Sequence, residues 1–277
     1  MMDLWLYGYG AMGRLHAEKL KSRPGIKLKI IDPAQGYAEP EGNPDGVIIA
    51  TPAKTHAEIA LRHLEAGRHC LIEKPLSSEL KSAEALSRFQ TTCPAFIERF
   101  CNLWNKAGFL SPRFVQAERI SPFSGRGTDV DVVLDLMIHD IDHCLRLMGE
   151  EPTDIQAIGI AAKTSRHDMV NARLSFSNGR ATQLSASRVS RTSKRRLRLF
   201  SDGDYLSIDL QKQNMHRIHW AANQSEPSPI KCNRNDPLTD MHDAFIDAIK
   251  GSAPFPISPG DGFSTMKVAM RIREALC

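Results

Sequence analysis

A glycine-rich segment close to the N-terminus sets the first limit on the fold. An apolar run over residues 4–8 leads into it, and residues 12–21 then place apolar side chains at helical spacing. Between a strand and a helix, the first glycine of such a loop permits a tight turn, the second lets a pyrophosphate approach, and the third lets helix and strand pack closely. The helix N-terminus adds N–H donors and a positive dipole end. The alternative is a set of turn glycines without a ligand. We predict that the phosphates of a dinucleotide are held by Gly8, Tyr9, Gly10, Ala11, Met12 and Gly13.

An acidic residue follows this loop at the spacing expected for a ribose ligand. Asp32 lies nineteen residues after Gly13, directly after a second apolar run. A carboxylate there binds the ribose hydroxyls and repels a 2′-phosphate, so we predict NAD rather than NADP as the cofactor. The segment between Asp32 and the third run is short, and it is rich in helix breakers: Pro33, Gly36, Pro40, Gly42 and Pro44. We therefore expect a loop here in place of a crossover helix.

Short apolar runs alternate with helical stretches through the first hundred residues. The runs that predict strands lie at residues 4–8, 28–31, 47–50, 69–72 and 95–98. This alternation predicts an α/β fold with a parallel sheet in a dinucleotide-binding domain over residues 1–112. Apolar and polar residues alternate from residue 154 to residue 220, which predicts an α+β domain over residues 113–277 with an antiparallel sheet of hairpins. Further helices are predicted at 132–147, 237–250 and 259–276, and a loop at 223–237.

Composition excludes several classes of protein. The chain has 277 residues, of which 42% are hydrophobic and 25% are charged, as in ordinary globular enzymes. No apolar run is long enough to cross a bilayer, and we see no secretory signal. The six cysteines form no CxxC pair, so we expect reduced thiols and a cytoplasmic location. A net charge of +4 is too small to indicate nucleic acid as a partner.

Two motifs stand where strands are predicted to end. Residues 50–52 follow the third apolar run, and residues 73–75 follow the fourth. Ligands of doubly wound sheets bind at the carboxyl ends of strands. Lys74 is held extended by the proline after it, and its ammonium group can stabilise a developing carbonyl oxygen or assist a proton shuttle. The alternative for Lys74 is a solvated surface lysine. The other candidates here, for cofactor binding, are Thr51, Pro52 and Glu73.

Three polar residues share one face of the helix predicted at 132–147. Asp135, His139 and His143 are spaced four residues apart. Hydride removal from a carbinol needs a base for the hydroxyl proton, and histidine titrates near neutral pH. We predict His139 as this base, and Asp135 as the group that orients it or holds a substrate hydroxyl. For His143 we favour a buried structural role. A zinc hydrolase is an alternative, but it needs a third ligand and an acid longer than Asp140, so we predict no metal.

The chain resembles the Gfo/Idh/MocA family of oxidoreductases. The matching motifs, in family order, are GYGAMG (8–13), ATPAKTH (50–56), EKP (73–75), LDLMIHDID (134–142) and PLTDMHDAFIDAI (237–249). The resemblance implies an N-terminal Rossmann domain and a C-terminal domain with a large open, mainly antiparallel sheet, whose last helices return to the first domain. It implies NAD(P) and reaction at a sugar or cyclitol carbon. The open sheet implies a homodimer or homotetramer.

Individual roles also follow from the resemblance. It implies that Lys74 is the active-site lysine and that His139 is the proton-transfer histidine, with Asp135 as its partner. His56, in the second motif, joins the cofactor-binding residues. The substrate-binding residues implied are Lys74, Arg99, Asp135, His139 and Arg188. One departure is that Asp131-Val132-Val133 replaces the paired glycines usual before Leu134, which is expected to reshape the substrate pocket.

Residues 129–143, together with a basic stretch at residues 188–198, are similar to a nucleotide-sugar branch of this family. The substrates of that branch are nucleotide sugars such as UDP-N-acetylglucosamine. Guanidinium groups suit the diphosphate of such a substrate. Alternation along a strand lets only some of these residues share a face, and the alternative is a solvated sheet edge. Competing functions are oxidation of a free sugar or cyclitol, a non-sugar substrate such as a tetrapyrrole, and a non-catalytic dinucleotide sensor. The basic residues are Arg188, Arg191, Lys194, Arg195, Arg196 and Arg198.

Overall fold

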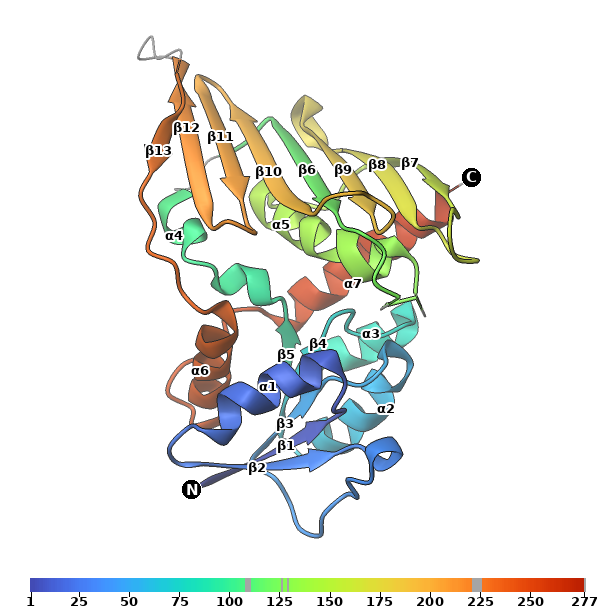
Figure 1. Cartoon of the computed structure of the whole chain (residues 1–277), viewed down its shortest axis with the longest axis vertical. Helices are drawn as coiled ribbons and strands as arrows, with labels where there is room; N and C mark the ends of the chain where they lie inside the picture. The colour runs from blue at the N-terminus through green and yellow to red at the C-terminus, as the bar shows by residue number, and fades with distance from the viewer. Residues whose placement is uncertain (108–110, 126, 129, 221–225, 277) are drawn as a thin grey trace. The chain divides into compact units, whose positions relative to one another are not determined.

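The computed structural model describes residues 1–107, 111–125, 127–128, 130–220 and 226–276. These residues form two compact units, of which one comprises residues 1–97 and 236–266 and the other residues 98–235 and 267–277 (Figure 1). The sequence places a domain boundary at residue 112, whereas the chain changes units at Glu98, because Glu98 bonds to strand and helix residues of the second unit.

The first unit contains a five-stranded parallel sheet with the order β2-β1-β3-β4-β5. All four residues of β3 are buried, so helices cover both faces of the sheet. Its strands are β1 (Met2–Tyr7), β2 (Ile26–Ile31), β3 (Gly46–Ile49), β4 (His69–Glu73) and β5 (Thr92–Ala95). Its longer helices are α1 (Ala11–Lys21), α2 (Ala53–Leu64), α3 (Leu80–Ser87) and α6 (Pro237–Ile249). The parallel sheet and four of the predicted strands are confirmed.

The fifth strand prediction, at residues 95–98, is wrong by about three residues. The strand runs from Thr92 to Ala95, and a 3₁₀ turn, η2 (Ile97–Phe100), follows it. The strand contains Pro94 and lies at the edge of the sheet, where a missing N–H is tolerated. The loop expected after Asp32 is confirmed, because only the 3₁₀ turn η1 (Pro33–Gln35) interrupts it before β3.

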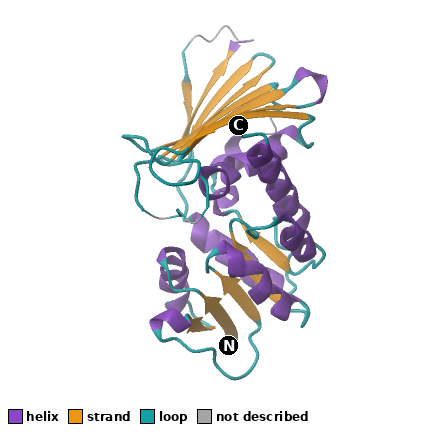
Figure 2. Cartoon of the chain, turned by 90° about the vertical axis from the view of Figure 1, so that its right-hand side faces the viewer, coloured by secondary structure: helices purple, strands orange, loops and turns teal. Residues whose placement is uncertain are grey.

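The second unit contains an eight-stranded sheet with the order β13-β12-β11-β10-β6-β9-β8-β7, whose twist is visible in Figure 2. Neighbouring strands are antiparallel except β6 and β9, so the sheet is mixed but mainly antiparallel, as expected. Its first strands are β6 (Phe114–Ile120), β7 (Asp154–Ile160), β8 (Met169–Ser175) and β9 (Ala181–Ser187), with the 3₁₀ turn η4 (Ser177–Gly179). The others are β10 (Lys194–Ser201), β11 (Asp204–Asp209), β12 (Asn214–His219) and β13 (Ser228–Ile230).

Strand β12 lies inside the region at 154–220 that was predicted to form strands, whereas β13 was not expected. The predicted loop at 223–237 is wrong where β13 forms; residues 223–225 lie outside the described residues. Three residues that include Pro229 carry no periodic signal, and they pair only at the edge of the sheet. In β12 the two apolar residues, Met215 and Ile218, are three positions apart, so they lie on opposite faces and give no period-two signal of their own.

Helices α4 (Leu103–Ala107), α5 (Ile138–Met148) and α7 (Pro259–Glu274) complete the described chain. The helix predicted at 132–147 is confirmed, but its first part, η3 (Val133–Met137), is a π-helical turn. Asp131 caps this turn by accepting hydrogen bonds from the N–H groups of Val133 and Leu134 (3.1 and 3.3 Å), and it also forms an ion pair with Arg273 of α7. Asp131 therefore anchors the turn that carries Asp135. Turns of this kind are often found at functional sites.

Candidate functional site

A cavity of about 610 Å³ lies in the first unit at the carboxyl ends of β1, β2 and β3. Five of the predicted cofactor-binding residues line it, which are Gly8, Gly10, Asp32, Thr51 and Pro52. Sequence analysis missed several lining residues in the loop after β2 and on α2: Gln35, Glu39, Ile59 and Arg62. No motif marks Gln35 and Glu39, because the loop that carries them has no regular pattern. The cavity position agrees with the rule that ligands of such sheets bind at strand ends.

The glycine-rich loop has the geometry that a pyrophosphate requires. Gly8 has a φ of +89°, and a Cβ there would lie 2.6 Å from the carbonyl oxygen of Ala50. A Cβ at Gly13 would lie 2.0 Å from the carbonyl oxygen of Gly8, so only glycine lets α1 approach β1 this closely. A Cβ at Gly10 would meet no described atom within 4 Å, which leaves open space above the loop. The loop and the N-terminus of α1 therefore fit the phosphates of NAD.

Asp32 is fixed at the mouth of this loop. Its Oδ2 accepts hydrogen bonds from the backbone N–H of Tyr9 and from Nε2 of Gln35, both at 2.8 Å. Gln35 Nε2 also donates to the carbonyl oxygen of Tyr9. The side chain of Asp32 is thus held beside the phosphate loop, with its second carboxylate oxygen available to accept from a ribose hydroxyl.

Replacing Asp32 with serine is expected to weaken NAD binding about ten-fold and to reduce the preference for NAD over NADP at least ten-fold. Serine removes both a charged acceptor for the ribose and the negative charge that repels a 2′-phosphate. Fluorescence titration with NADH and NADPH measures both effects, and Glu41→Gln, an exposed change in the same loop, is the matched control. If the unmodified protein already binds NADPH more tightly, the ribose assignment is wrong.

His56 connects the loops that follow β3 and β4. Its Nε2 lies 2.8 Å from the carbonyl oxygen of Thr51, and its Nδ1 lies 2.9 Å from that of Pro75. The ring is 1% exposed. A neutral ring donates a hydrogen bond to one of these two carbonyls and a protonated ring donates to both, so in either form the ring contacts both strand-end segments. His56 is therefore placed to fix the backbone beside Lys74, and a contact between His56 and the cofactor stays a prediction.

Glu73 belongs to a buried polar chain that crosses the first unit. Its Oε1 lies 3.0 Å from His16 Nε2, and His16 Nδ1 lies 2.7 Å from His242 Nε2 on α6. Burial lowers the pKa of His242 to about 3, and the neighbouring charge of His16 acts in the same direction. The carboxylate of Glu73 is thus bound to α1, while its backbone leads directly into Lys74. Lys74 precedes a cis proline, Pro75.

Acid is expected to destabilise the protein through His242. An unfolded histidine takes up a proton below a pKa of about 6.5, whereas folded His242 stays neutral down to about pH 3. The unfolded state therefore binds more protons in this window, and the free energy of unfolding should fall as pH falls, by roughly 2 kcal/mol at pH 5. His242→Gln should remove this part of the loss in urea unfolding curves at neutral and acid pH. If the free energy of unfolding fell as much with acid in His242→Gln as in the unmodified chain, His242 would not be the group responsible. His216→Gln is the control, and it should behave as the unmodified chain does.

In the second unit, Asp135 lies in the π-helical turn and His139 in the first turn of α5. Gly127 packs against the Asp135 carboxylate so closely that a Cβ at Gly127 would lie 2.5 Å from Oδ2. The carbonyl oxygen of Gly127 accepts a hydrogen bond of 2.8 Å from the buried guanidinium of Arg188. Arg188 thus supports the loop that borders Asp135.

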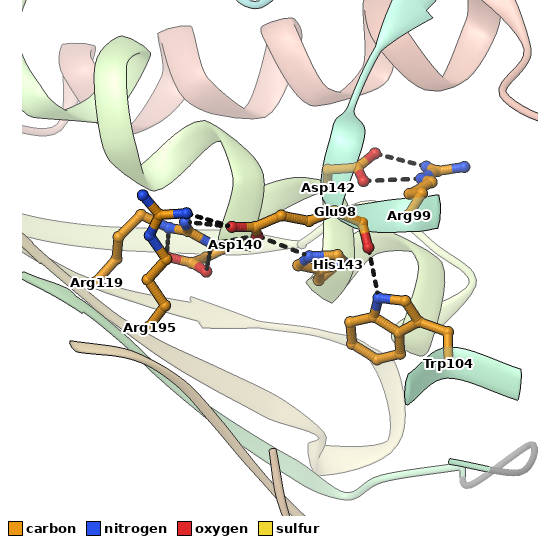
Figure 3. A network of polar contacts seen from close by, with 8 residues as sticks. All are labelled: Glu98, Arg99, Trp104, Arg119, Asp140, Asp142, His143 and Arg195. Atoms are coloured by element: carbon orange, nitrogen blue, oxygen red, sulfur yellow. Dashed lines mark hydrogen bonds and ion pairs between the residues drawn. The ribbon is translucent and has the colours of Figure 1, made fainter. Parts of the chain in front are cut away.

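A buried network of charged groups surrounds the next turn of α5 (Figure 3). Arg119 of β6 donates to both oxygens of Glu98 (2.8 and 2.6 Å) and to both oxygens of Asp140 (3.0 and 2.8 Å). His143 Nε2 lies 3.3 Å from Glu98 Oε2, and its ring packs on Trp104. Burial alone would raise the pKa of Glu98, but Arg119 and His143 outweigh it and hold that pKa well below its usual range.

Several candidate residues in and near this network are bound by other protein side chains. His143 is buried beside Glu98, in agreement with the structural role favoured for it. Asp140, the acid that a zinc hydrolase would use, is bound by Arg119. Arg99 donates from two nitrogens to Asp142 at 2.8 and 2.5 Å. Arg188 forms an ion pair with Asp168 at 2.8 Å and is 3% exposed. Substrate contacts by Arg99 and Arg188 therefore stay predictions, since protein groups already bind both guanidinium groups.

Comparison with known proteins places these features in a family. Residues 13–93 match an oxidoreductase family with an NAD-binding Rossmann fold, and residues 111–206 match the Gfo/Idh/MocA C-terminal domain. UDP-N-acetylglucosamine 3-dehydrogenase of Acidithiobacillus ferrooxidans is 33% identical over 304 residues, covering 99% of this chain and 97% of the relative. A solved structure of that enzyme gives a TM-score of 0.88 at 32% identity, with 99% and 97% of the two chains covered.

Other similar proteins have names that refer to other substrates. The scyllo-inositol 2-dehydrogenase (NAD(+)) of Bacillus subtilis is 26% identical over 226 residues, which cover 66% of each chain. An aldose–aldose oxidoreductase structure from Caulobacter crescentus gives a TM-score of 0.82 at 18% identity, with 99% of this chain and 97% of that one covered. The second likeness concerns the fold alone. In the described residues, no helix is long and apolar enough to span a membrane.

Proposed function

We propose that this chain, which belongs to the Gfo/Idh/MocA oxidoreductase family, oxidises a hydroxyl group of a nucleotide sugar with NAD as the hydride acceptor. The observation that carries the proposal is the Asp135–His139 pair, one helical turn apart, in a chain that also builds a dinucleotide cradle at Gly8–Gly13. A dinucleotide sensor needs the cradle but no base. The pair therefore favours an enzyme over a sensor.

In this proposal, each residue has a defined task. Bound NAD supplies a nicotinamide ring that accepts a hydride from the carbinol carbon. His139 takes the hydroxyl proton on a ring nitrogen, and Asp135 holds a substrate hydroxyl or orients the ring. Lys74 presents a positive charge to the oxygen as it becomes a carbonyl. Asp32 selects NAD by binding the ribose hydroxyls.

A nucleotide sugar is proposed because a relative that is 33% identical over 99% of the chain is a UDP-N-acetylglucosamine 3-dehydrogenase. A free cyclitol is the second candidate, since the inositol dehydrogenase match covers 66% of the chain. Both classes of substrate present a secondary hydroxyl to a base and a hydride acceptor. They differ in the diphosphate, which a cyclitol lacks.

The test is formation of NADH when the purified protein is mixed with NAD and UDP-N-acetylglucosamine in the presence of a carbonyl trap. Growth of the NADH absorbance band with this substrate, and not with free N-acetylglucosamine, supports the proposal. Growth with myo-inositol or scyllo-inositol instead supports the cyclitol candidate. If no sugar or cyclitol produces NADH while NADH still binds, the sensor remains.

We also propose that the protein acts in the cytoplasm, where NAD and nucleotide sugars occur. We propose in addition that it forms a homodimer or homotetramer through the eight-stranded sheet. On the sheet face opposite the one that contacts α5, the rings of Phe114, Phe200, Tyr205 and Trp220 follow one another at centroid distances of 5.9, 5.1 and 6.2 Å. Ile158 and Ile160 on β7 are 65% and 53% exposed. Exposed apolar surface of this kind marks interfaces. Sedimentation velocity tests it, and a monomer at micromolar concentration would contradict it.

A further inference from the structure

Strand β10 divides the basic stretch of the sequence between the two faces of the eight-stranded sheet. Leu197 and Leu199 are buried, and Arg195 shares their face because side chains alternate along a strand. Lys194 lies on the opposite face, where its Nζ is 3.5 Å from Glu118. Arg196 and Arg198 alternate with the two buried leucines, so they lie on the same face as Lys194. Only Arg195 among the basic residues of β10 therefore faces the α5 side, which carries Asp135 and His139.

Arg195 lies directly opposite another arginine. In the antiparallel pairing of β10 with β6, Arg195 is the partner of Arg119. Two like charges opposite each other repel, so the pair requires a negative group between them. Glu98 is that group: it accepts two hydrogen bonds from Arg119, and its Oε1 lies 3.6 Å from Nη1 of Arg195 (Figure 3).

The two arginines differ in how strongly they are held. Arg119 has a side chain 4% exposed and forms bidentate contacts with both Glu98 and Asp140. Arg195 has a side chain 57% exposed, and among the described residues its ion pair is with a carboxylate that Arg119 already binds, at 3.6 Å. A guanidinium has five donors in a planar fork suited to phosphate oxygens. Arg195 can thus turn toward an anion while Arg119 keeps Glu98 in place.

The same carboxylate connects Arg195 with the candidate catalytic helix. Glu98 Oε2 lies 3.3 Å from His143, and His139 precedes His143 by one turn of α5. Attraction to His139 is also among the causes that lower the pKa of Glu98. An anion bound by Arg195 would therefore sit beside the segment that holds the proposed base.

We propose that Arg195 binds the diphosphate of the substrate and thereby selects nucleotide sugars over free sugars. This inference rests on the proposed function and names the residue that gives it its specificity. Arg195 is not proposed to take part in proton or hydride transfer. Its effect is therefore expected on substrate affinity.

The test compares Arg195→Gln with Lys194→Ala, an adjacent change to a half-exposed cation on the other face of the same strand. In Arg195→Gln, the KM for UDP-N-acetylglucosamine and the Kd for UDP should each rise about ten-fold or more. The kcat should change less than three-fold, the Kd for NADH should be unchanged, and Arg195→Lys should recover part of the affinity. In Lys194→Ala all four values should match the unmodified protein.

Two failures are distinguishable in this experiment. If the unmodified protein neither binds UDP nor oxidises a UDP-sugar, the proposed nucleotide-sugar substrate is wrong and the role of Arg195 falls with it. If the unmodified protein does both and Arg195→Gln binds UDP equally well, only the role of Arg195 is wrong. A fall in kcat without a change in KM or in UDP affinity would also overturn it. Circular dichroism spectra and melting temperatures confirm that each variant is folded.

Discussion

His139→Ala is expected to lower kcat by about 100- to 10,000-fold, while the Kd for NADH changes less than two-fold. The loss is that of a general base positioned on the substrate hydroxyl. The cofactor cradle is built by Gly8–Gly13 and Asp32 of the other compact unit, so its affinity should not depend on this side chain. Stopped-flow turnover and NADH fluorescence titration measure the two quantities separately.

The matched control for this change is His143→Gln, one turn further along α5. His143 is 1% exposed and bonded to Glu98, so its loss should reduce stability more than chemistry. Raising the pH should partly restore turnover in His139→Ala, because hydroxide in solvent can then take the proton, but not in His143→Gln. Equal kcat in His139→Ala and the unmodified protein would remove His139 from the mechanism.

Arg119→Met is expected to lower the free energy of unfolding by about 3–5 kcal/mol. The substitution leaves Glu98 and Asp140 buried without the cation that binds both, and an uncompensated buried charge is strongly destabilising. Methionine preserves much of the apolar volume, so the loss of the charge is the main change. Urea unfolding followed by tryptophan fluorescence measures the difference.

Arg113→Met provides the control for Arg119→Met. Arg113 also forms an ion pair, with Asp202 at 3.5 Å, but the two side chains are 70% and 83% exposed. Exposed pairs contribute about 0–1 kcal/mol, so this variant should unfold almost as the unmodified protein does. A loss in Arg119→Met no larger than that in Arg113→Met would contradict the view that the network holds α5 in place.

The sequence predicts the first unit well because local patterns decide it. The glycines at 8, 10 and 13 have separate steric tasks, and each task is visible in the structure as a turn, an open space or a close contact. The run of prolines and glycines after Asp32 is equally local, and the expected loop forms there. Gln35 and Glu39 could not be predicted, because they reach the cavity through a loop whose path follows no regular pattern.

The side-chain contacts of the second unit are harder to predict from the sequence, because they join residues that are far apart along the chain. Glu98 and Arg119 are 21 positions apart, and Glu98 and His143 are 45 apart, so nothing in the local pattern links them. The π-helical turn at Asp135 has the composition of an ordinary helix. The basic stretch shows positive charge in the sequence, yet only the register of β10 against β6 separates Arg195 from Arg196.

The measurement that bears most directly on the central claim is transfer of the substrate hydrogen itself. UDP-N-acetylglucosamine that carries deuterium on all the carbons of its sugar ring is incubated with the protein and NAD, and the NADH produced is analysed by mass spectrometry. We expect NADH that is one mass unit heavier than unlabelled NADH. In His139→Ala, labelled NADH should form only at the low rate of its residual turnover. NADH formed without deuterium would contradict direct hydride transfer from the sugar ring, and no NADH from any nucleotide sugar would contradict the proposed substrate.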